Sequence, residues 1–261
     1  MSVAELVPGR VSHGPAYVRA GGVPVNAALA AAASGARCAV VGRVGEDPAS
    51  AAIRAELEAA GVEAILAVDP QLPTGTFVES GYGEERAVSA DRGASAQLSP
   101  ADVPSPLSAR AVLVSGHTLL RDDTAAAARA ALDAADAPLV AVVAAASALI
   151  GDEFHERARG ANVLLANEEE AWALTALLGR DAAVKLAERY ELVAVTAGAG
   201  GAVAAYQGEV VVARLIEAVP GAQSGAGDAF AGVLLVSLAA GAGLQEALDE
   251  ACEAGRRALQ L

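Results

Sequence analysis

The sequence predicts an α/β fold: a doubly wound, mostly parallel sheet flanked by helices, with a small β lid. Apolar segments of strand length alternate with alanine-rich segments of helical length, a pattern typical of strand–helix–strand units. Hydrophobic residues make up 54% of the sequence and aromatic residues only 3%, so the core must consist of small aliphatic side chains. A chain of 261 residues can bury such a core, and we expect residues 1–261 to form a single domain.

Stop and turn residues delimit the elements of the first half. Gly35 and Gly61 each follow an alanine-rich stretch, where glycine commonly ends a helix. They predict a helix at 25–33 followed by a strand at 38–41. They also predict a helix at 49–60 followed by a strand at 62–68. Short strands are expected on either side of the turn at 81–83, at 77–80 and 85–89. Two turn-rich segments interrupt the alternation, and we expect them to form the lid, at about 11–22 and 74–94.

The second half continues the alternation. Strands are predicted where β-branched and other apolar residues cluster, at 112–115, 139–143, 163–166 and 192–196. Helices are predicted between or after them, at 123–135, 153–159, 168–178 and 182–190. Two apolar segments around a short turn indicate a hairpin, at 201–206 and 209–213, and a further helix is expected at 229–238. The longest apolar run, 139–150, is shorter than the ~20 residues that span a bilayer, so it is interpreted as a buried strand.

Composition excludes several classes of function. The formal net charge is −14, and such a surface repels nucleic acids and anionic membranes, so neither is an expected partner. The two cysteines, Cys38 and Cys252, lie far apart, and the three histidines lack the spacing of a zinc site. The N-terminus has no basic segment followed by an apolar one, the pattern of a signal peptide. A reduced, cytoplasmic protein is therefore expected.

The stretch Gly225-Ala226-Gly227-Asp228 is the most informative motif. Small residues at a helix start expose unpaired N–H groups next to the positive end of the helix dipole, which favours an anion site. An aspartate in the same turn fits if Asp228 is a catalytic base and the N–H groups hold a transferring phosphoryl group. The structural alternative is a tight turn with Asp228 as a helix cap.

Four other stretches have comparable alternatives. One stretch contains Gly21, Gly22 and Asn26. Its glycines would let the backbone approach a ligand closely, with the Asn26 amide at a helix start, or the stretch is an ordinary loop with an asparagine early in the helix. Asn167-Glu168-Glu169-Glu170 follows a strand, where α/β folds bind ligands and Mg²⁺, although glutamates in a first helical turn also suit the dipole. The glycine-rich segment 196–201 follows a strand and suits a phosphate or a ribose. Arg43 is expected either to contact an anion or to be a solvated loop residue.

The order of these stretches carries more information than any one of them. The chain resembles the ribokinase-like (pfkB) family of carbohydrate and nucleoside kinases over nearly its whole length. The matching stretches are Gly21-Gly22 with Asn26, Gly42-Arg43-Val44-Gly45-Glu46-Asp47, Gly61-Val62, Pro73-Thr74-Gly75-Thr76, Asn167 with Glu170, Val195-Thr196 with Gly198 and Gly201, and Gly225-Ala226-Gly227-Asp228-Ala229-Phe230 with Gly232. Residues 91–98 are similar to a segment of sugar-acid and fructose kinases in this family.

The resemblance implies that the γ-phosphoryl group of ATP moves to a hydroxyl of a sugar or sugar acid. Asp228 would be the general base, and the N–H groups of Gly225, Ala226 and Gly227 the anion hole. Gly21, Gly22 and Asn26 would bind the acceptor. Thr196, Gly198 and Gly201 would line the nucleotide site, while Asn167 and Glu170 would organise Mg²⁺ and the phosphates, with Glu170 on the metal side. Family members often pair through their lids, which implies a homodimer.

Several positions depart from the family pattern. Most of the family's first strand is missing at 1–7, and Ala222-Gln223-Ser224 replaces D-T-T, so a complete monovalent-cation site is not expected. Residues 142–147 lack the polar groups of a D-x-N-x-R segment, and Cys252 replaces an asparagine near the adenine. These departures leave a second hypothesis, a pseudokinase of the same fold that binds a sugar or nucleotide, or acts as a scaffold, without turnover.

Overall fold

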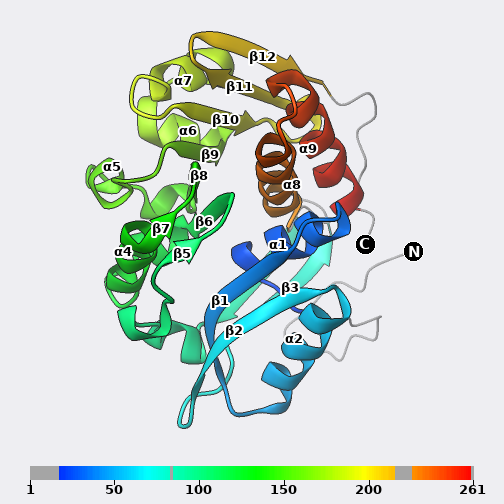
Figure 1. Cartoon of the computed structure of the whole chain (residues 1–261), viewed down its shortest axis with the longest axis vertical. Helices are drawn as coiled ribbons and strands as arrows, with labels where there is room; N and C mark the ends of the chain where they lie inside the picture. The colour runs from blue at the N-terminus through cyan, green and yellow to red at the C-terminus, as the bar shows by residue number, and fades with distance from the viewer. Residues whose placement is uncertain (1–17, 83–84, 215–224, 260–261) are drawn as a thin grey trace.

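A six-stranded sheet forms the centre of the protein (Figure 1). The computed structural model describes residues 18–82, 85–214 and 225–259. The sheet has the order β12-β11-β10-β9-β8-β6, in which the four strands from β6 to β10 run parallel and the last two form an antiparallel hairpin. Its strands are β6 (Ala111–Ser115), β8 (Leu139–Val143), β9 (Val163–Asn167), β10 (Leu192–Thr196), β11 (Ala202–Tyr206) and β12 (Glu209–Ala213).

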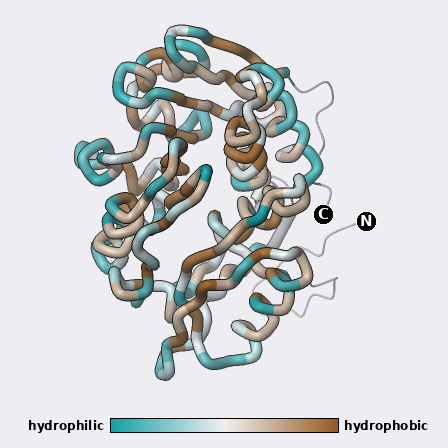
Figure 2. The backbone as a smooth tube through the Cα atoms, in the orientation of Figure 1, coloured by the Kyte–Doolittle hydropathy of each residue, from teal (hydrophilic) through white to brown (hydrophobic). Residues whose placement is uncertain are grey.

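Helices cover both faces of this sheet, because its strands are apolar on both sides. In β8, Val140 and Val142 join one core cluster and Ala141 joins the other. The first cluster includes residues of α3 (Gly116–Leu120), α4 (Ala125–Ala134), α5 (Phe154–Arg157), α6 (Glu168–Thr175) and α7 (Gly179–Leu186). The second includes residues of α8 (Ala226–Ala240) and α9 (Leu244–Ala258). Figure 2 shows hydrophobic stretches in α8 and the strands and hydrophilic ones in outer helices and loops. The predicted doubly wound α/β fold is confirmed.

A smaller layer lies beside the central sheet (Figure 1). β1 (Cys38–Gly45) and β2 (Val62–Asp69) pair in parallel as a separate two-stranded sheet, next to α2 (Pro48–Ala59). Among the residues that the structure describes, these two strands pair with each other and not with the six-stranded sheet. Sequence order shows that a strand follows a helix but not which sheet it joins. β3 (Thr76–Tyr82) and β4 (Glu85–Asp91) form the predicted hairpin.

Several element boundaries differ from those predicted. α9 was not expected, although Leu244, Ala247, Leu248 and Ala251 follow the helical period and are all buried. The five-residue α3 was also missed because it is too short to show a period. Short paired strands at β5 (Leu107–Ser108) and β7 (Ala135–Asp136), and 3-10 turns at 93–97, 100–102, 147–149 and 198–200, complete the fold. In the described part of the chain, no helix is long and apolar enough to cross a membrane.

The helix α1 (Val23–Ala33) packs unusually closely against α8. A Cβ atom added to Gly232 would lie 2.1 Å from the carbonyl oxygen of Ala27, so the two backbones are in direct contact there. Asn26 precedes Ala27, and Asp228 lies one helical turn before Gly232. This contact therefore places the side-chain amide of Asn26 opposite the carboxylate of Asp228.

The first prediction concerns this contact. Gly232→Ala should destabilise the protein by about 1–3 kcal/mol, the usual cost of overpacking, even though alanine favours helix. The control is Gly227→Ala in the same helix, where an added Cβ meets no atom within 4 Å. Chemical unfolding of the two variants measures the difference. Equal or greater stability of Gly232→Ala would show that the helices separate without cost.

Candidate active site

A cavity of about 320 Å³ opens at the carboxyl ends of the parallel strands. Val143, Asn167 and Thr196 end β8, β9 and β10, and all three line it. Gly225, Gly227 and Asp228 from the start of α8 form another part of its wall. Ligands of open α/β sheets bind at this edge, so the topology itself marks the cavity as a candidate site.

Asp228 lies in the first turn of α8, partly buried in the wall of the cavity. Desolvation by burial raises the pKa of its carboxyl group, and the hydrogen bond from Asn26 acts in the opposite direction. The Nδ2 atom of Asn26 donates to Oδ2 of Asp228 over 2.8 Å. Two residues far apart in the sequence thus meet as a pair, which leaves Oδ1 of Asp228 for a second partner.

The start of α8 has an open backbone. Gly225 is the N-cap and has a φ of 89°, a conformation that favours glycine. A Cβ added to Gly225 would lie 3.3 Å from Nδ2 of Asn26, whereas one added to Gly227 would meet nothing within 4 Å. Because Ala226 and Gly227 occupy the first two helical positions, their N–H groups have no partner inside the helix. The structural alternative, a turn with Asp228 as the helix cap, is wrong, because the N-cap is Gly225 and no described side chain caps this helix.

Asn167 and Glu170 are a reciprocal cap of α6. Oδ1 of Asn167 accepts from the N–H of Glu170 over 2.8 Å, and Oε2 of Glu170 accepts from the N–H of Asn167 over 2.9 Å. Both residues also line the cavity. Burial, with repulsion from Glu169 and Asp228, raises the pKa of Glu170 to about 7. The structural interpretation of this motif is therefore confirmed, while the ligand-binding interpretation stays a prediction for the same two side chains.

The other residues predicted to bind the nucleotide differ in whether they line the cavity. Thr196 lines the cavity, but Gly198 and Gly201 do not. Gly201 has a φ of 91°, and a Cβ there would lie 2.0 Å from the carbonyl oxygen of Ala213, so the turn into β11 requires glycine. Gly198 has open space around its Cα and remains accessible to a ligand. The structure thus gives Gly201 a role in the fold, and its role in nucleotide binding stays a prediction.

Gly21 and Gly22 lie just before α1, and Gly22 is its N-cap. A Cβ at either position would meet nothing within 4 Å, so their backbone is open to a ligand. The N–H of Ala20 donates to Oε2 of Glu56 on α2 over 2.7 Å, which fixes the start of this loop. Val23, the next residue, lines the cavity with Asp228. The predicted acceptor residues are therefore adjacent to the cavity, with Asn26 in contact with the candidate base.

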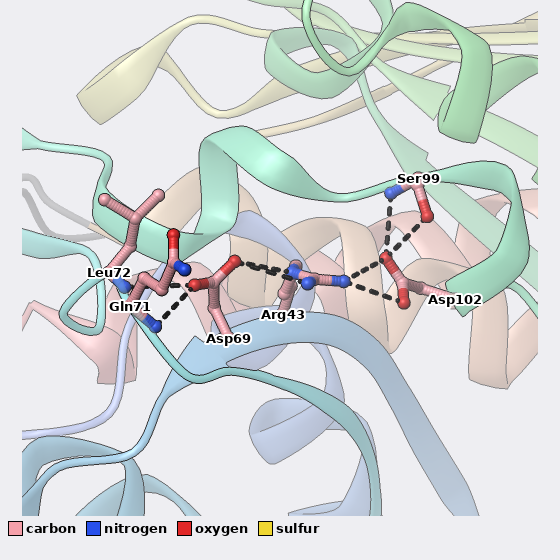
Figure 3. A network of polar contacts seen from close by, with 6 residues as sticks. All are labelled: Arg43, Asp69, Gln71, Leu72, Ser99 and Asp102. Atoms are coloured by element: carbon pink, nitrogen blue, oxygen red, sulfur yellow. Dashed lines mark hydrogen bonds and ion pairs between the residues drawn. The ribbon is translucent and has the colours of Figure 1, made fainter.

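Arg43 is not a solvated loop residue, so that alternative is wrong, and the anions that it meets are two carboxylates of the chain itself (Figure 3). Its guanidinium lies between two carboxylates, 3.2 Å from Oδ2 of Asp69 and 3.0 Å from Oδ2 of Asp102. Asp69 also accepts from the N–H groups of Gln71 and Leu72, and Asp102 from Ser99. The sequence around Arg43 does not show which carboxylates its guanidinium group will contact, because they come from distant segments. Arg43 joins β1 and β2 to the 3-10 turn at 100–102.

Other matching stretches are also structural. Asp47 accepts hydrogen bonds from both the N–H and the hydroxyl of Thr74, over 2.7 and 2.6 Å, and caps α2 through Ser50. The hydroxyl of Thr74 in turn accepts from the N–H of Gly45 over 3.0 Å. The two stretches at 42–47 and 73–76 therefore form one joint of the smaller layer.

His117 lines the same cavity and was missed by sequence reasoning. A lone histidine after a strand carries no spacing signal, and α3 itself was not expected. Desolvation, followed by the charges of Arg121 and Arg92, lowers the pKa of His117, so its ring is neutral at physiological pH. Within the described ranges, no group of three or more acidic, histidine or cysteine side chains is placed to hold a metal ion.

Comparison with known proteins gives consistent results. The sequence pattern of pfkB family carbohydrate kinases matches residues 9–260. The chain is 32% identical over 252 residues to the bifunctional protein HldE of Caulobacter vibrioides, covering 88% of this chain and 50% of that protein. It therefore spans about half the length of this curated relative.

Solved structures extend the likeness to three dimensions. Adenosine kinase from Sinorhizobium meliloti superimposes with a TM-score of 0.86 at 26% identity, over 95% of this chain and 80% of that one. A fructokinase from Vibrio cholerae, solved with fructose, ADP and a calcium ion, gives 0.77 at 27% identity, over 92% and 84%. The predicted ribokinase-like fold is confirmed by these neighbours.

The second prediction concerns Glu170. Because its folded-state pKa is about 7 and its ordinary value is 4.5, the folded protein loses stability as pH rises through that window. Glu170→Gln removes this loss and keeps a side chain that can cap α6. The variant should gain on the order of 1–2 kcal/mol over the parent protein between pH 4.5 and 8, after allowance for solvent screening.

Urea unfolding at both pH values measures that difference. Glu168→Gln is the matched control, since Glu168 is an exposed carboxylate in the same helical turn. A gain that is the same at both pH values, or equal in the control, would contradict the assignment.

Proposed function

The chain belongs to the pfkB family of carbohydrate kinases, and from this premise we propose that it transfers the γ-phosphoryl group of ATP to a hydroxyl of a sugar or sugar acid. One observation supports this above all. Asp228, held by Asn26, shares a cavity wall with the open N-terminus of α8. A base beside an anion site is the arrangement that phosphoryl transfer to an alcohol requires.

Asp228 is the general base in this proposal. The acceptor oxygen forms a bond to the γ-phosphorus, the bond from that phosphorus to the bridging oxygen of ADP breaks, and Asp228 receives the hydroxyl proton. The raised pKa of Asp228 makes it a better proton acceptor than an exposed aspartate. Asn26 keeps the carboxylate oriented, because its amide donates to Oδ2. The N–H groups at Gly225, Ala226 and Gly227 stabilise the charge of the phosphoryl group in transit.

Gly21, Gly22 and Asn26 bind the acceptor in this proposal, and Asn167, Thr196, Gly198 and Gly201 the nucleotide. Glu170 lies on the metal side of the cavity. Mg²⁺ that arrives with nucleotide phosphates keeps several waters and needs only one or two carboxylates, so the residues present fit it. Glu170 would hold the ion, which would neutralise phosphate charge, and a cation beside Glu170 would lower the raised pKa of its carboxyl group.

The third prediction tests the base. Asp228→Asn should lower kcat by about 10²–10⁴-fold, the usual contribution of general base catalysis, and leave nucleotide binding intact. The measurement is ADP release with Mg²⁺ and ATP across hexoses, pentoses, sugar acids and nucleosides. Asp249→Asn, which changes an exposed aspartate on α9, is the control. Unchanged kcat in Asp228→Asn would refute the assignment, while sugar or nucleotide binding without any turnover would favour the pseudokinase.

We also propose that the smaller layer pairs two copies of the chain. Val68 on β2 and Phe77 and Val78 on β3 are 48%, 59% and 55% exposed, so this layer presents apolar side chains that a second copy could cover. The fourth prediction is that the protein is a dimer by light scattering and that Phe77→Ser shifts it towards monomer. Leu178→Ser, at another exposed apolar residue, is the control. A monomeric parent protein would refute the proposal.

A further inference from the structure

The loop before α1 is anchored to α2 through a buried backbone donor. Ala20 is only 3% exposed, and its N–H donates to Oε2 of Glu56 over 2.7 Å. A buried N–H without a partner is costly, so this bond satisfies a requirement of the fold. Because the partner is a carboxylate, the bond is of the stronger, charge-assisted kind. A residue of α2 therefore fixes the point from which the chain leads into α1.

Two glycines separate this anchor from the helix. A Cβ added to Gly21 or Gly22 would meet nothing within 4 Å, so neither residue is closely packed against the described part of the chain. Gly22 has a φ of 96°, and its carbonyl accepts from the N–H of Asn26 over 3.0 Å. Glycine has more conformational freedom than any other residue. The position of the two glycines thus depends on their two ends, the bond from Ala20 to Glu56 and the first turn of α1.

The carboxylate of Glu56 is carried by a helix that is itself well fixed. Leu57, the next residue, is fully buried in the core cluster beneath α1. Nη2 of Arg54 donates to the carbonyl of Leu66 on β2 over 2.9 Å. At the other end of α2, Asp47 caps the helix and binds the segment before β3. A helix held at both ends is a rigid support for a loop that must keep one position.

We propose that Glu56 is a positioning residue for the acceptor, although it is not among the residues that line the cavity. It acts through Ala20 and keeps the backbone of Gly21 and Gly22 where hydroxyl groups of a sugar meet it. Another hydroxyl of the same sugar meets Asp228. A site that is already held in its bound geometry loses less entropy when it binds, so the anchor strengthens acceptor binding rather than the chemical step. This inference rests on the proposed kinase function and adds to it a residue of the smaller layer.

The fifth prediction is that Glu56→Met weakens the acceptor site and leaves the chemical step in place. Methionine keeps the length of the side chain and favours helix, but it has no oxygen to accept from Ala20. The KM and the dissociation constant of the acceptor should rise by about tenfold, as expected for one lost charge-assisted hydrogen bond. The kcat and the KM of ATP should change much less. ADP release and calorimetry measure these quantities for fructose, ribose, 2-keto-3-deoxygluconate and adenosine.

Two further variants and one further readout complete the test. Glu56→Gln keeps a carbonyl oxygen on a side chain of the same length, so it should restore most of the acceptor affinity that Glu56→Met loses. Glu58→Met, which changes an exposed glutamate of the same helix, should alter none of these quantities. Amide hydrogen exchange reports the anchor without any turnover. The N–H of Ala20 should exchange faster in Glu56→Met than in the parent protein and in Glu56→Gln.

Two results would overturn the proposal. The first is an acceptor KM that is the same in Glu56→Met and in the parent protein, even if urea unfolding shows a loss of stability, because Glu56 would then have a structural role alone. The second is a loss of kcat with the acceptor KM unchanged, because the anchor would then act on the chemical step.

Binding and turnover together separate this role of Glu56 from the kinase activity. Acceptor binding that depends on Glu56, without ADP release by the parent protein, would support the positioning role and refute the kinase. Turnover with the same acceptor KM in the parent protein and in Glu56→Met would support the kinase and refute the positioning role. A parent protein that neither binds nor phosphorylates any of the four acceptors would refute both.

Discussion

The contact between the backbones of α1 and α8 determines the geometry of the candidate site. Gly232 permits this contact, since any side chain there would meet the carbonyl of Ala27. The contact brings Asn26 to hydrogen-bonding distance of Asp228, and Gly225 leaves room for the Asn26 amide. Burial of a carboxylate is unfavourable, and the Asn26 donor offsets part of that cost. One glycine in the middle of a helix therefore supports the arrangement of the proposed base.

Charge repulsion is the second constraint on the cavity. Burial raises the pKa of both Glu170 and Asp228, and the charge of Asp228 raises the pKa of Glu170 further. A phosphoryl group that enters would add more negative charge. The open N-terminus of α8 supplies fixed positive dipoles against it. In the proposed function, a divalent ion that binds with the nucleotide would supply the remaining positive charge.

Much of this arrangement could be predicted from the sequence because it depends on local rules. Gly35 and Gly61 predicted the ends of α1 and α2, and the small residues at 225–228 predicted the start of α8. Contacts between segments that are far apart in the sequence could not be predicted from such local rules. β1 and β2 have strand sequences, yet nothing in them shows that they pair apart from the main sheet. Arg43 meets Asp69 and Asp102 from two distant segments, and His117 lies on a helix too short to have a period.

The same limit applies to functional roles, because one residue can serve two purposes. Gly201 is required by a turn, and Asn167 and Glu170 cap a helix that also borders the cavity. The motif alone cannot distinguish these roles from ligand binding, whereas exposure to the cavity can. Arg92 shows the same point outside the cavity. It directly follows β4 and forms an ion pair with Asp123 in the turn after α3, so one guanidinium group connects the β3–β4 hairpin to an element beside the central sheet.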